Sequence, residues 1–414
     1  MRRLIPLLIP ILCALPAMGA EMIAPAFDKP PHDYWSRPLK DPFTKLKTEM
    51  EAGRLQLDAS RGEKAYLLQL LQALGVPASS QMLIFSTTSL QLRFITPANP
   101  RALYFNENVY VGYIPGARIE VVSVDPDLGG IYYIFDIPRG TEPPHIERSN
   151  RCMNCHAAED TDGVPGLVIK SVLPGIRGGS LDSYRHTPAG HNVPFAERFG
   201  GWYVTGAEKF PSFLGNAIGQ FVDQDIRRIP LTPGERFDYA RYPVATSDVL
   251  PQLVHEHQIG FVNRAASATY RTRALLDQGH GRLDAAASQT LDAAARAFTR
   301  YLFFADEVPL PNGGVVGDNA FKSDFLKTRR VVQGGSLKDF DLQTHLFRYR
   351  CSYMIESAAF GGLPPEFKQR VYRRMWQALD VTRPDPEYTY LPPAEKQAIH
   401  TLVRASLTDL PAGW

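Results

Sequence analysis

The chain has 414 residues, of which 44% are hydrophobic and 21% are charged, and its formal net charge is +2 at pH 7. This composition is typical of a folded globular protein and excludes a disordered or collagen-like chain. The length exceeds the ~250–300 residues that one hydrophobic core usually serves, so we expect more than one lobe. A nearly neutral charge argues against nucleic acid or an anionic membrane as a partner.

Residues 1–20 have the pattern of a secretory signal peptide. Arg2 and Arg3 form a basic start, residues 4–16 are mainly apolar, and residues 17–20 are small residues typical of a cleavage region. The apolar run is shorter than the ~20 residues that a membrane-spanning helix needs. The sequence therefore predicts an exported protein with no stable membrane insertion once the signal is removed.

Residues 21–140 are expected to form an N-terminal arm and a sheet-rich lobe. The Pro-rich residues 21–60 predict an irregular arm, anchored by Tyr34 and Trp35, and leucines at helical spacing predict a helix over 61–74. Short apolar runs punctuated by Gly, Pro, Asn and Asp then predict an antiparallel or mixed sheet. These runs are residues 82–85, 90–95, 109–114, 119–124 and 131–137.

Residues 141–247 are rich in Gly and Pro and contain the spacing Cys-x-x-Cys-His at Cys152, Cys155 and His156. This is the spacing at which proteins attach haem c. The two thiols form thioethers with the vinyl groups of the haem, and the histidine becomes the proximal ligand of the iron. The sequence thus predicts one covalent haem c in this segment.

Two other sites share part of this pattern. A zinc knuckle needs four ligands and usually a second Cys or His pair at short spacing, which this sequence lacks. A thioredoxin-like redox pair opens a helix after a strand, and a following His would be incidental. The predicted export favours haem c, because cytochrome c maturation attaches the haem outside the cytoplasm.

Several other residues are candidates for contacts with the haem. The carbonyl of Pro165 could orient His156 by accepting its Nδ1–H, although Pro165 could equally be a turn residue. Trp202 and Tyr203 could contact the haem face or a propionate, or pack in the core. The same two alternatives apply to the aromatic residues of the sheet region, Tyr104, Phe105, Tyr110, Tyr113, Tyr132 and Tyr133.

The ligand opposite His156 decides between electron transfer and chemistry at the iron. Methionine raises the reduction potential, a second histidine lowers it, and an open position admits peroxide or oxygen. No Met lies between Met153 and Met354, so our first choice is His191, in a predicted loop. Behind it stand His186, Met354 and His145. For a peroxidase, which needs a distal base and a charged helper, the available residues are Glu147, Arg148 and Arg198.

Residues 248–414 are expected to form a helical lobe. Periodic apolar residues predict a helix over 282–304, and proline pairs at 364–365 and 392–393 open two more. Cys351 is predicted to be a buried, unpaired thiol. The expected fold class is α+β, with an N-terminal sheet region, an irregular haem-binding segment and a helical C-terminal part.

Several stretches resemble a family of large, exported c-type cytochromes with a single haem. They are residues 100–106, 109–112, 123–126, 200–206, 347–353 and 371–374. In that family a His-Met-Gly-Asn stretch often follows the Gly-Gly-Trp-Tyr run, but this chain has Phe213-Leu214-Gly215-Asn216, so any axial ligand from there is missing.

The resemblance implies covalent haem c and electron transfer with a redox protein partner in the periplasm. Two alternatives remain open at this point. One is a peroxidase- or oxygenase-like haem enzyme with a substrate pocket in the extra lobe. The other is a haem-based redox or gas sensor.

Overall fold

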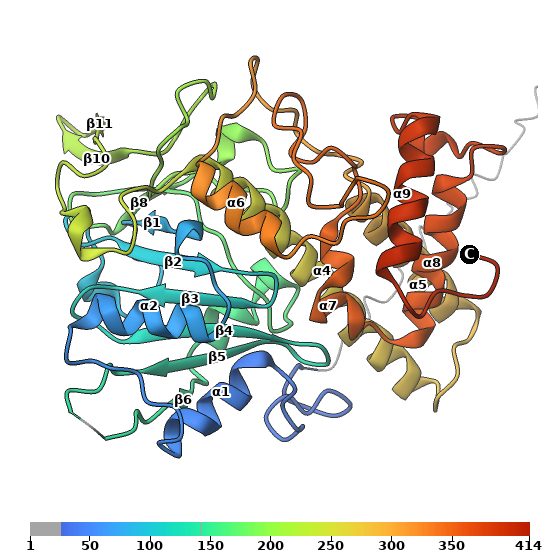
Figure 1. Ribbon diagram of the computed structural model, residues 1–414, viewed down its shortest axis with the longest axis horizontal. Coiled ribbons are helices and arrows are strands. Elements are labelled where there is room, and N and C mark those ends of the chain that lie inside the picture. Colours follow the sequence, from blue (N-terminus) through green and yellow to red (C-terminus); the bar gives the residue numbers. More distant parts are fainter. Residues whose placement is uncertain (1–25, 141) are drawn as a thin grey trace, which may run out of the picture.

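The structure is a computed structural model that describes residues 26–140 and 142–414. The expected signal peptide, residues 1–20, lies outside the described residues. The α+β class is confirmed, because strands dominate the N-terminal half and helices the C-terminal part. Figure 1 shows the sheet on one side of the molecule and the helices α5, α8 and α9 on the other.

Seven strands of the described chain form one antiparallel sheet in the order β6-β5-β4-β3-β2-β1-β9. Polar side chains close its tight turns: Asn106 accepts the N–H groups of Asn108 and Val109, at 2.9 Å each, between β2 and β3. The strands are β1 Met82–Ile84, β2 Arg101–Phe105, β3 Val109–Tyr113, β4 Ile119–Asp125, β5 Gly129–Phe135, β6 Glu147–Arg148 and β9 Trp202–Tyr203.

The two faces of the sheet are covered by different parts of the chain. Helices α1 (Pro42–Glu51) and α2 (Glu63–Ala73) pack on one face, against side chains such as Val111 and Val121. Because side chains alternate along a strand, the neighbouring residues point to the other face, toward helix α4. The sheet is therefore buried on both sides over much of its area.

The N-terminal arm is more regular than expected. Residues 42–51 form α1 because the side chain of Asp41 accepts N–H groups of the first turn and Pro42 suits the first helical position. Tyr34 is fully buried, and its hydroxyl donates to the carbonyl of Gly130 at 2.7 Å. The predicted anchoring by Tyr34 is confirmed, whereas the prediction of an irregular arm is wrong for α1.

One strand prediction is also wrong. Within residues 90–95 the backbone forms only a short 3-10 turn, and the side chain of Gln91 exchanges hydrogen bonds with the backbone of Arg118 at 2.8 and 2.9 Å. The strand lies instead at residues 101–105, where it pairs with both β1 and β3. The apolar Leu90 and Leu92, which suggested a strand, are exposed.

The segment 141–247 has little regular structure, as expected, but it contributes β9 to the edge of the sheet beside β1. Two hairpins also form in this segment, and one of them lies at the upper left edge of the molecule in Figure 1. They are formed by β7 Val172–Pro174 with β8 Ser180–Ser183, and by β10 Ala217–Val222 with β11 Asp225–Pro230.

The C-terminal part is helical, as expected. Helix α4 (Val249–Gln278) has 30 residues and begins at Asp248, whose side chain accepts the N–H of Leu250 at 3.0 Å. One hydrophobic cluster extends from the sheet through α4 to the last helices, so the core crosses the expected boundaries at 140 and 247. The other helices are α5 Ala285–Leu302, α6 Asn319–Lys327, α7 Ala358–Gly361, α8 Pro365–Leu379 and α9 Pro393–Ser406.

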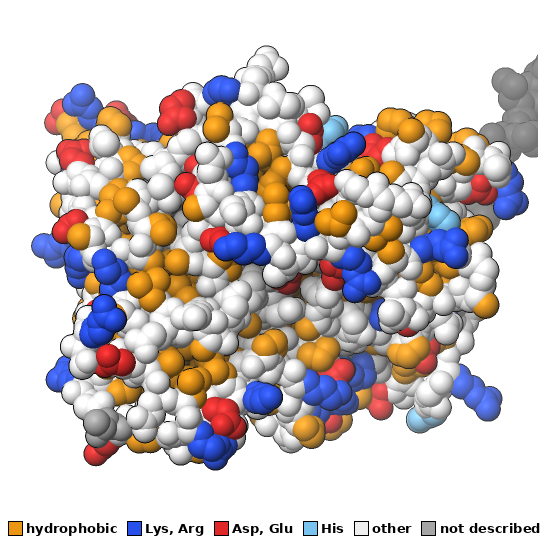
Figure 2. All heavy atoms as spheres, viewed as in Figure 1, with side chains coloured by type: hydrophobic (Ala, Val, Ile, Leu, Met, Phe, Trp, Pro, Cys, Tyr) orange, Lys and Arg blue, Asp and Glu red, His pale blue; other side chains and the backbone are white. Residues whose placement is uncertain are grey.

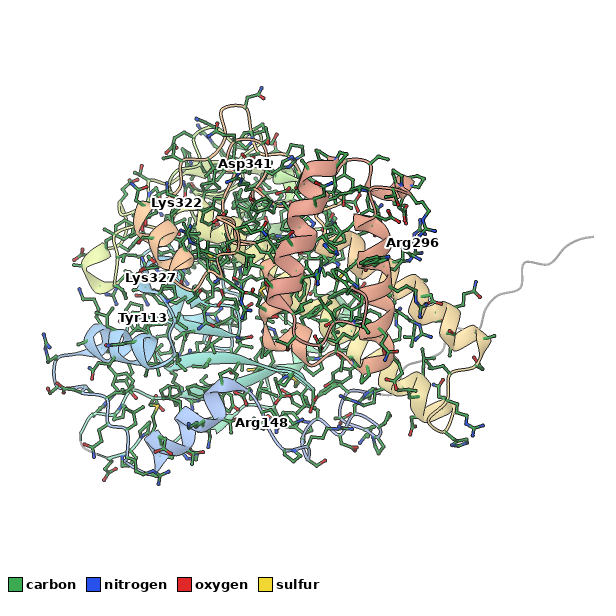
Figure 3. All side chains as sticks on the ribbon, turned by 45° about the vertical axis from the view of Figure 1, so that its right-hand side comes forward. Tyr113, Arg148, Arg296, Lys322, Lys327 and Asp341 are labelled. Carbon is green, nitrogen blue, oxygen red and sulfur yellow. The ribbon has the colours of Figure 1, made fainter. Side chains whose placement is uncertain are left out.

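The surface carries both signs of charge. Basic and acidic side chains are interspersed over the face shown in Figure 2. Figure 3 shows Arg296 on α5 at the outside of the helical part, where it forms an ion pair with Glu387 at 2.5 Å. In the described part of the chain, no helix combines the length and apolar character needed to cross a membrane.

Candidate functional site

Cys152, Cys155 and His156 lie on a single turn of helix. This turn, α3 (Met153–His156), follows Cys152, whose carbonyl accepts the N–H groups of Cys155 at 3.2 Å and His156 at 3.0 Å. Residues three apart on a helix share one face, so the two thiols point to the same side. Neither thiol is in a disulfide. The turn is attached to the sheet because Ser149 donates its N–H to the carbonyl of Tyr132 at 2.9 Å.

The imidazole of His156 has a defined orientation. Its Nδ1 lies 3.0 Å from the carbonyl oxygen of Gly166, and since a carbonyl only accepts, Nδ1 carries the proton. The hydroxyl of Tyr132 donates to the same oxygen, and the two rings lie 4.6 Å apart. Pro165, one candidate for this contact, does not make it, because its carbonyl accepts the N–H of Gly130. Nε2 is thus the nitrogen left to bind a ligand.

Helix α4 holds the acceptor of this hydrogen bond in place. Asn263 accepts the N–H of Leu167 and donates to its carbonyl, both at 2.8 Å. At Gly166 a Cβ would lie 2.7 Å from Oδ1 of Asn263, so only glycine fits between α4 and the turn. The orientation of His156 is therefore determined by a helix far away in the sequence.

Cys152, Cys155 and His156 line a cavity of about 490 Å³ between the sheet and α4. This volume lies within the ~300–1,000 Å³ typical of small-molecule and cofactor sites. Most of the wall is apolar or aromatic, and its floor is the α4-facing side of the sheet. The wall includes Ile84, Leu103, Val122, Leu167, Trp202 and Ile259, and the mouth includes the exposed Leu90 and Leu92.

A partly buried ion pair lies in the same wall. Nη2 of Arg101 is 2.6 Å from Oε2 of Glu120, and both side chains are about 15% exposed. Gly112 makes room for the pair, since a Cβ there would lie 2.9 Å from Nη2 of Arg101. The Nε atom of Arg101 is buried and has no hydrogen-bond partner among the described residues. The wall therefore holds one cationic donor with unused hydrogen-bonding capacity.

Burial sets the protonation states of the site. It lowers the pKa of His156 to about 4, so the imidazole is neutral at neutral pH, which is the state that binds metals. Burial raises the pKa of the Cys152 thiol, unlike the lowered values of reactive thioredoxin-like cysteines. Burial also acts to raise the pKa of Glu120, but the charge of Arg101 and hydrogen bonds from Ser89 and Gln91 outweigh it and lower that pKa.

Comparisons with family models, curated proteins and solved structures found no match. The resemblance to exported single-haem cytochromes therefore stays a prediction.

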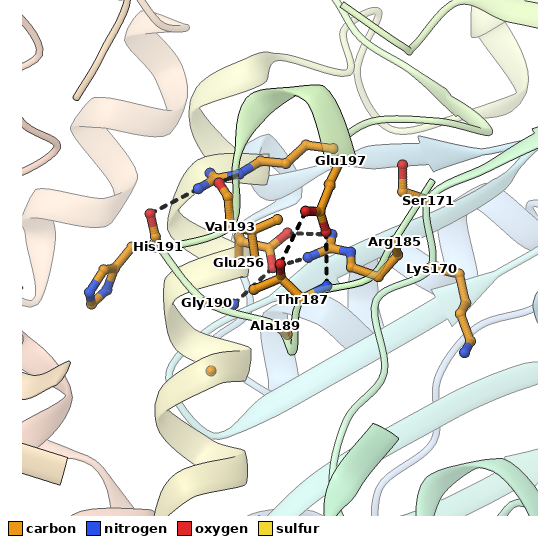
Figure 4. A network of polar contacts seen from close by, with 12 residues as sticks. Lys170, Ser171, Arg185, Thr187, Ala189, Gly190, His191, Val193, Glu197 and Glu256 are labelled. Carbon is orange, nitrogen blue, oxygen red and sulfur yellow. Dashed lines mark hydrogen bonds and ion pairs between the residues drawn. The ribbon is translucent and has the colours of Figure 1, made fainter. Parts of the chain in front are cut away.

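The structure does not bring His191, our first choice for the distal ligand, to the cavity that His156 lines, which argues against that role. Its Nδ1 lies 2.8 Å from Nδ1 of His257, and its ring stacks on Tyr301 and Phe304, at 4.1 and 4.5 Å. His191 is close to His156 in the sequence but not in space, because the loop around residue 191 folds against α4 and α5 rather than over the cavity. Figure 4 shows His191 beside a separate polar network around Glu256.

None of the other candidates for distal ligand or catalytic helper lines the cavity; these are His145, Glu147, Arg148, His186, Arg198 and Met354. The guanidinium of Arg198, for example, donates to the carbonyls of His191 and Val193 at 2.9 and 2.8 Å. Within the described residues, no group of three or more His, Cys, Asp and Glu is placed to hold a bare metal ion.

The aromatic candidates divide between the two faces of the sheet. Tyr110, Tyr132 and Trp202 line the cavity, and Trp202 donates its Nε1–H to the carbonyl of Lys170 at 2.9 Å. Tyr203 points to the opposite face, where its hydroxyl donates to the carbonyl of Pro97 at 2.8 Å.

The polar residues of the cavity wall that we did not predict from the sequence include Arg101, Glu120 and His255. His255 had a recognisable signal. It lies in the run Val254-His255-Glu256-His257, which places three polar side chains within one apolar helical stretch. Such a run in a buried helix indicates that some polar groups face a site or a polar network.

Proposed function

We propose that this chain is an exported c-type cytochrome that transfers electrons to or from a protein partner in the periplasm. In this proposal Cys152 and Cys155 hold one haem through thioether bonds and His156 is the proximal ligand of its iron. One observation carries the proposal: a single helical turn presents both free thiols and an oriented imidazole to one cavity of about 490 Å³.

The donor set and the cavity wall fit this group. The proton on Nδ1 of His156 is held by the carbonyl of Gly166, which leaves Nε2 for the iron, as in other metal-binding histidines. The apolar wall suits the macrocycle, and the unpartnered Nε of Arg101 offers a donor for a propionate carboxylate. A bound haem would supply reversible one-electron chemistry.

The protein would hold the haem in the cavity and leave one edge of it accessible to a partner protein. Cys155 and Arg151 are exposed beside the cavity, and Leu90 and Leu92 at its mouth are 41% and 55% exposed. A partner protein that contacts these residues would approach the vinyl-bearing edge of the haem. The predicted signal peptide supports a periplasmic location. Haem attachment and the redox partner would both be found there.

The proposal is tested by a pyridine haemochrome assay on protein expressed with a cytochrome c maturation system. We expect one haem per chain, and almost none bound covalently after Cys152→Ala together with Cys155→Ala. Cys351→Ala is the matched control, because Cys351 is a buried thiol outside the cavity and should leave the haem content unchanged. Wild-type protein without covalent haem would overturn the proposal.

A second readout tests the carrier role. We expect reversible one-electron reduction of the wild-type protein in voltammetry and no consumption of peroxide. Steady turnover of peroxide would instead support a haem enzyme.

A further inference from the structure

The register of the sheet places two tyrosines on either side of strand β4, and each of them lies beside a histidine of the cavity wall. Tyr110 of β3 pairs with Val122 of β4, which pairs with Tyr132 of β5, and all three line the cavity. Since neighbouring strands lie ≈ 4.7–4.9 Å apart, the backbones of the two tyrosines are ~10 Å apart. The ring of His156 lies 4.6 Å from that of Tyr132, and the ring of His255 lies 5.7 Å from that of Tyr110.

The side chain of His255 is enclosed by aromatic residues. His255 is only 5% exposed, and its ring lies 5.3 Å from the ring of Phe105 and 6.5 Å from that of Trp202. Ile259, one helical turn further along α4, lines the cavity next to it. The position of the imidazole is therefore defined by packing.

The nitrogens of this ring have no assigned partner. Hydrogen bonds engage ring nitrogens of His156, His191 and His257, but none reaches His255 from any described residue. A neutral imidazole has one ring nitrogen with a free lone pair, which can bind a metal. Neither nitrogen is among the fully buried atoms without a partner, so both keep accessible surface, and the cavity that His255 lines is open to a ligand there.

We propose that His255 is the second axial ligand of the haem iron, opposite His156. This inference rests on the proposed function, because it requires haem at Cys152 and Cys155. Val122 lies between the two tyrosines, and each tyrosine contacts one of the two histidines, so the same cavity would hold the group between them.

Ligation fits this residue better than a role as a distal base at an open iron. A peroxidase needs a free charged group beside its distal base. Here two partly buried charged side chains of the wall, Arg101 and Glu120, form an ion pair with each other. Two histidine ligands would give a closed, low-spin iron with a low reduction potential, which suits electron transfer.

The neighbouring His257 provides a matched control. Residues two apart on a helix point in different directions, and His257 contacts His191 and Ser352, at 2.8 Å each, rather than the cavity. Both histidines are buried on α4, so His255→Ala and His257→Ala remove the same atoms from similar surroundings.

The test is the absorption and electron paramagnetic resonance spectrum of the haem-loaded protein, ferric and ferrous, with and without carbon monoxide. We expect wild-type protein and His257→Ala to be low-spin and insensitive to carbon monoxide. His255→Ala should become high-spin and bind carbon monoxide, and added imidazole should restore the low-spin spectrum. His255→Met, which keeps most of the side-chain volume, should stay low-spin with a raised potential.

Two results would overturn the inference while leaving the proposed function intact. One is covalent haem that is high-spin and binds carbon monoxide in the wild type. The other is a low-spin spectrum that persists in His255→Ala. The absence of covalent haem would be a failure of the proposed function itself, and the intact mass of each variant distinguishes this case.

Discussion

Arg185→Met should destabilise the fold by about 3–5 kcal/mol, because it leaves a buried carboxylate without its partner. Nη1 and Nη2 of Arg185 lie 2.9 and 3.0 Å from the two carboxylate oxygens of Glu256, and the two side chains are only 7% and 5% exposed. The N–H of Gly190 also donates to Glu256, at 2.9 Å (Figure 4). This network connects the loop before His191 to α4.

Equilibrium urea unfolding at pH 7, followed by circular dichroism, measures this loss. Arg296→Met is the control, because the ion pair of Arg296 is 55% exposed on the arginine side and exposed pairs contribute little. Adding Glu256→Gln to Arg185→Met should recover most of the stability, since it removes the uncompensated charge. The reasoning is refuted if Arg185→Met costs no more than Arg296→Met, or if the second substitution recovers nothing.

The same variant should respond to pH with a defined sign. Burial acts to raise the pKa of Glu256, but the charge and hydrogen bonds of Arg185 outweigh it and lower that pKa in the wild type. The pair's contribution is thus present above the ordinary glutamate pKa of ~4.3 and lost as the pH falls below it. In Arg185→Met burial is left to raise the pKa, so the deficit relative to wild type should shrink from pH 7 toward pH 5.

Two further predictions concern the cavity wall, measured by the same urea unfolding. Asn263→Ala should lower the free energy of unfolding by about 2 kcal/mol, because it removes two hydrogen bonds to Leu167 that contribute ~1 kcal/mol each. An unchanged free energy of unfolding would contradict the role given to α4. Gly112→Ala should lower the free energy of unfolding by about 1–3 kcal/mol, because the new Cβ displaces Arg101. Gly361→Ala is the control and should cost less, since a Cβ there meets nothing within 4 Å. Equal losses in the two variants would contradict this prediction.

The parts of the fold that depend on local sequence could be predicted. Leucine spacing gave the helix now seen at 63–73, and proline pairs gave the starts of α8 and α9. The turn carrying Cys152, Cys155 and His156 is also local, so its residues could be placed on one site before the structure was known.

What the sequence could not supply are contacts between distant segments. The wall opposite His156 comes from α4 and the sheet, and sequence distance gave no sign that His255 would line it while His191 would not. The hydrogen-bond acceptor of His156 was missed by one residue, since Pro165 and Gly166 both follow the motif closely and only packing against Asn263 decides between their carbonyls.

The measurement that tests the central claim most directly is mass spectrometry of the peptide containing residues 151–156, from protein expressed with a cytochrome c maturation system. The account predicts that this peptide carries one haem, attached at Cys152 and Cys155. A peptide with two free thiols, or with a disulfide between them, would contradict it.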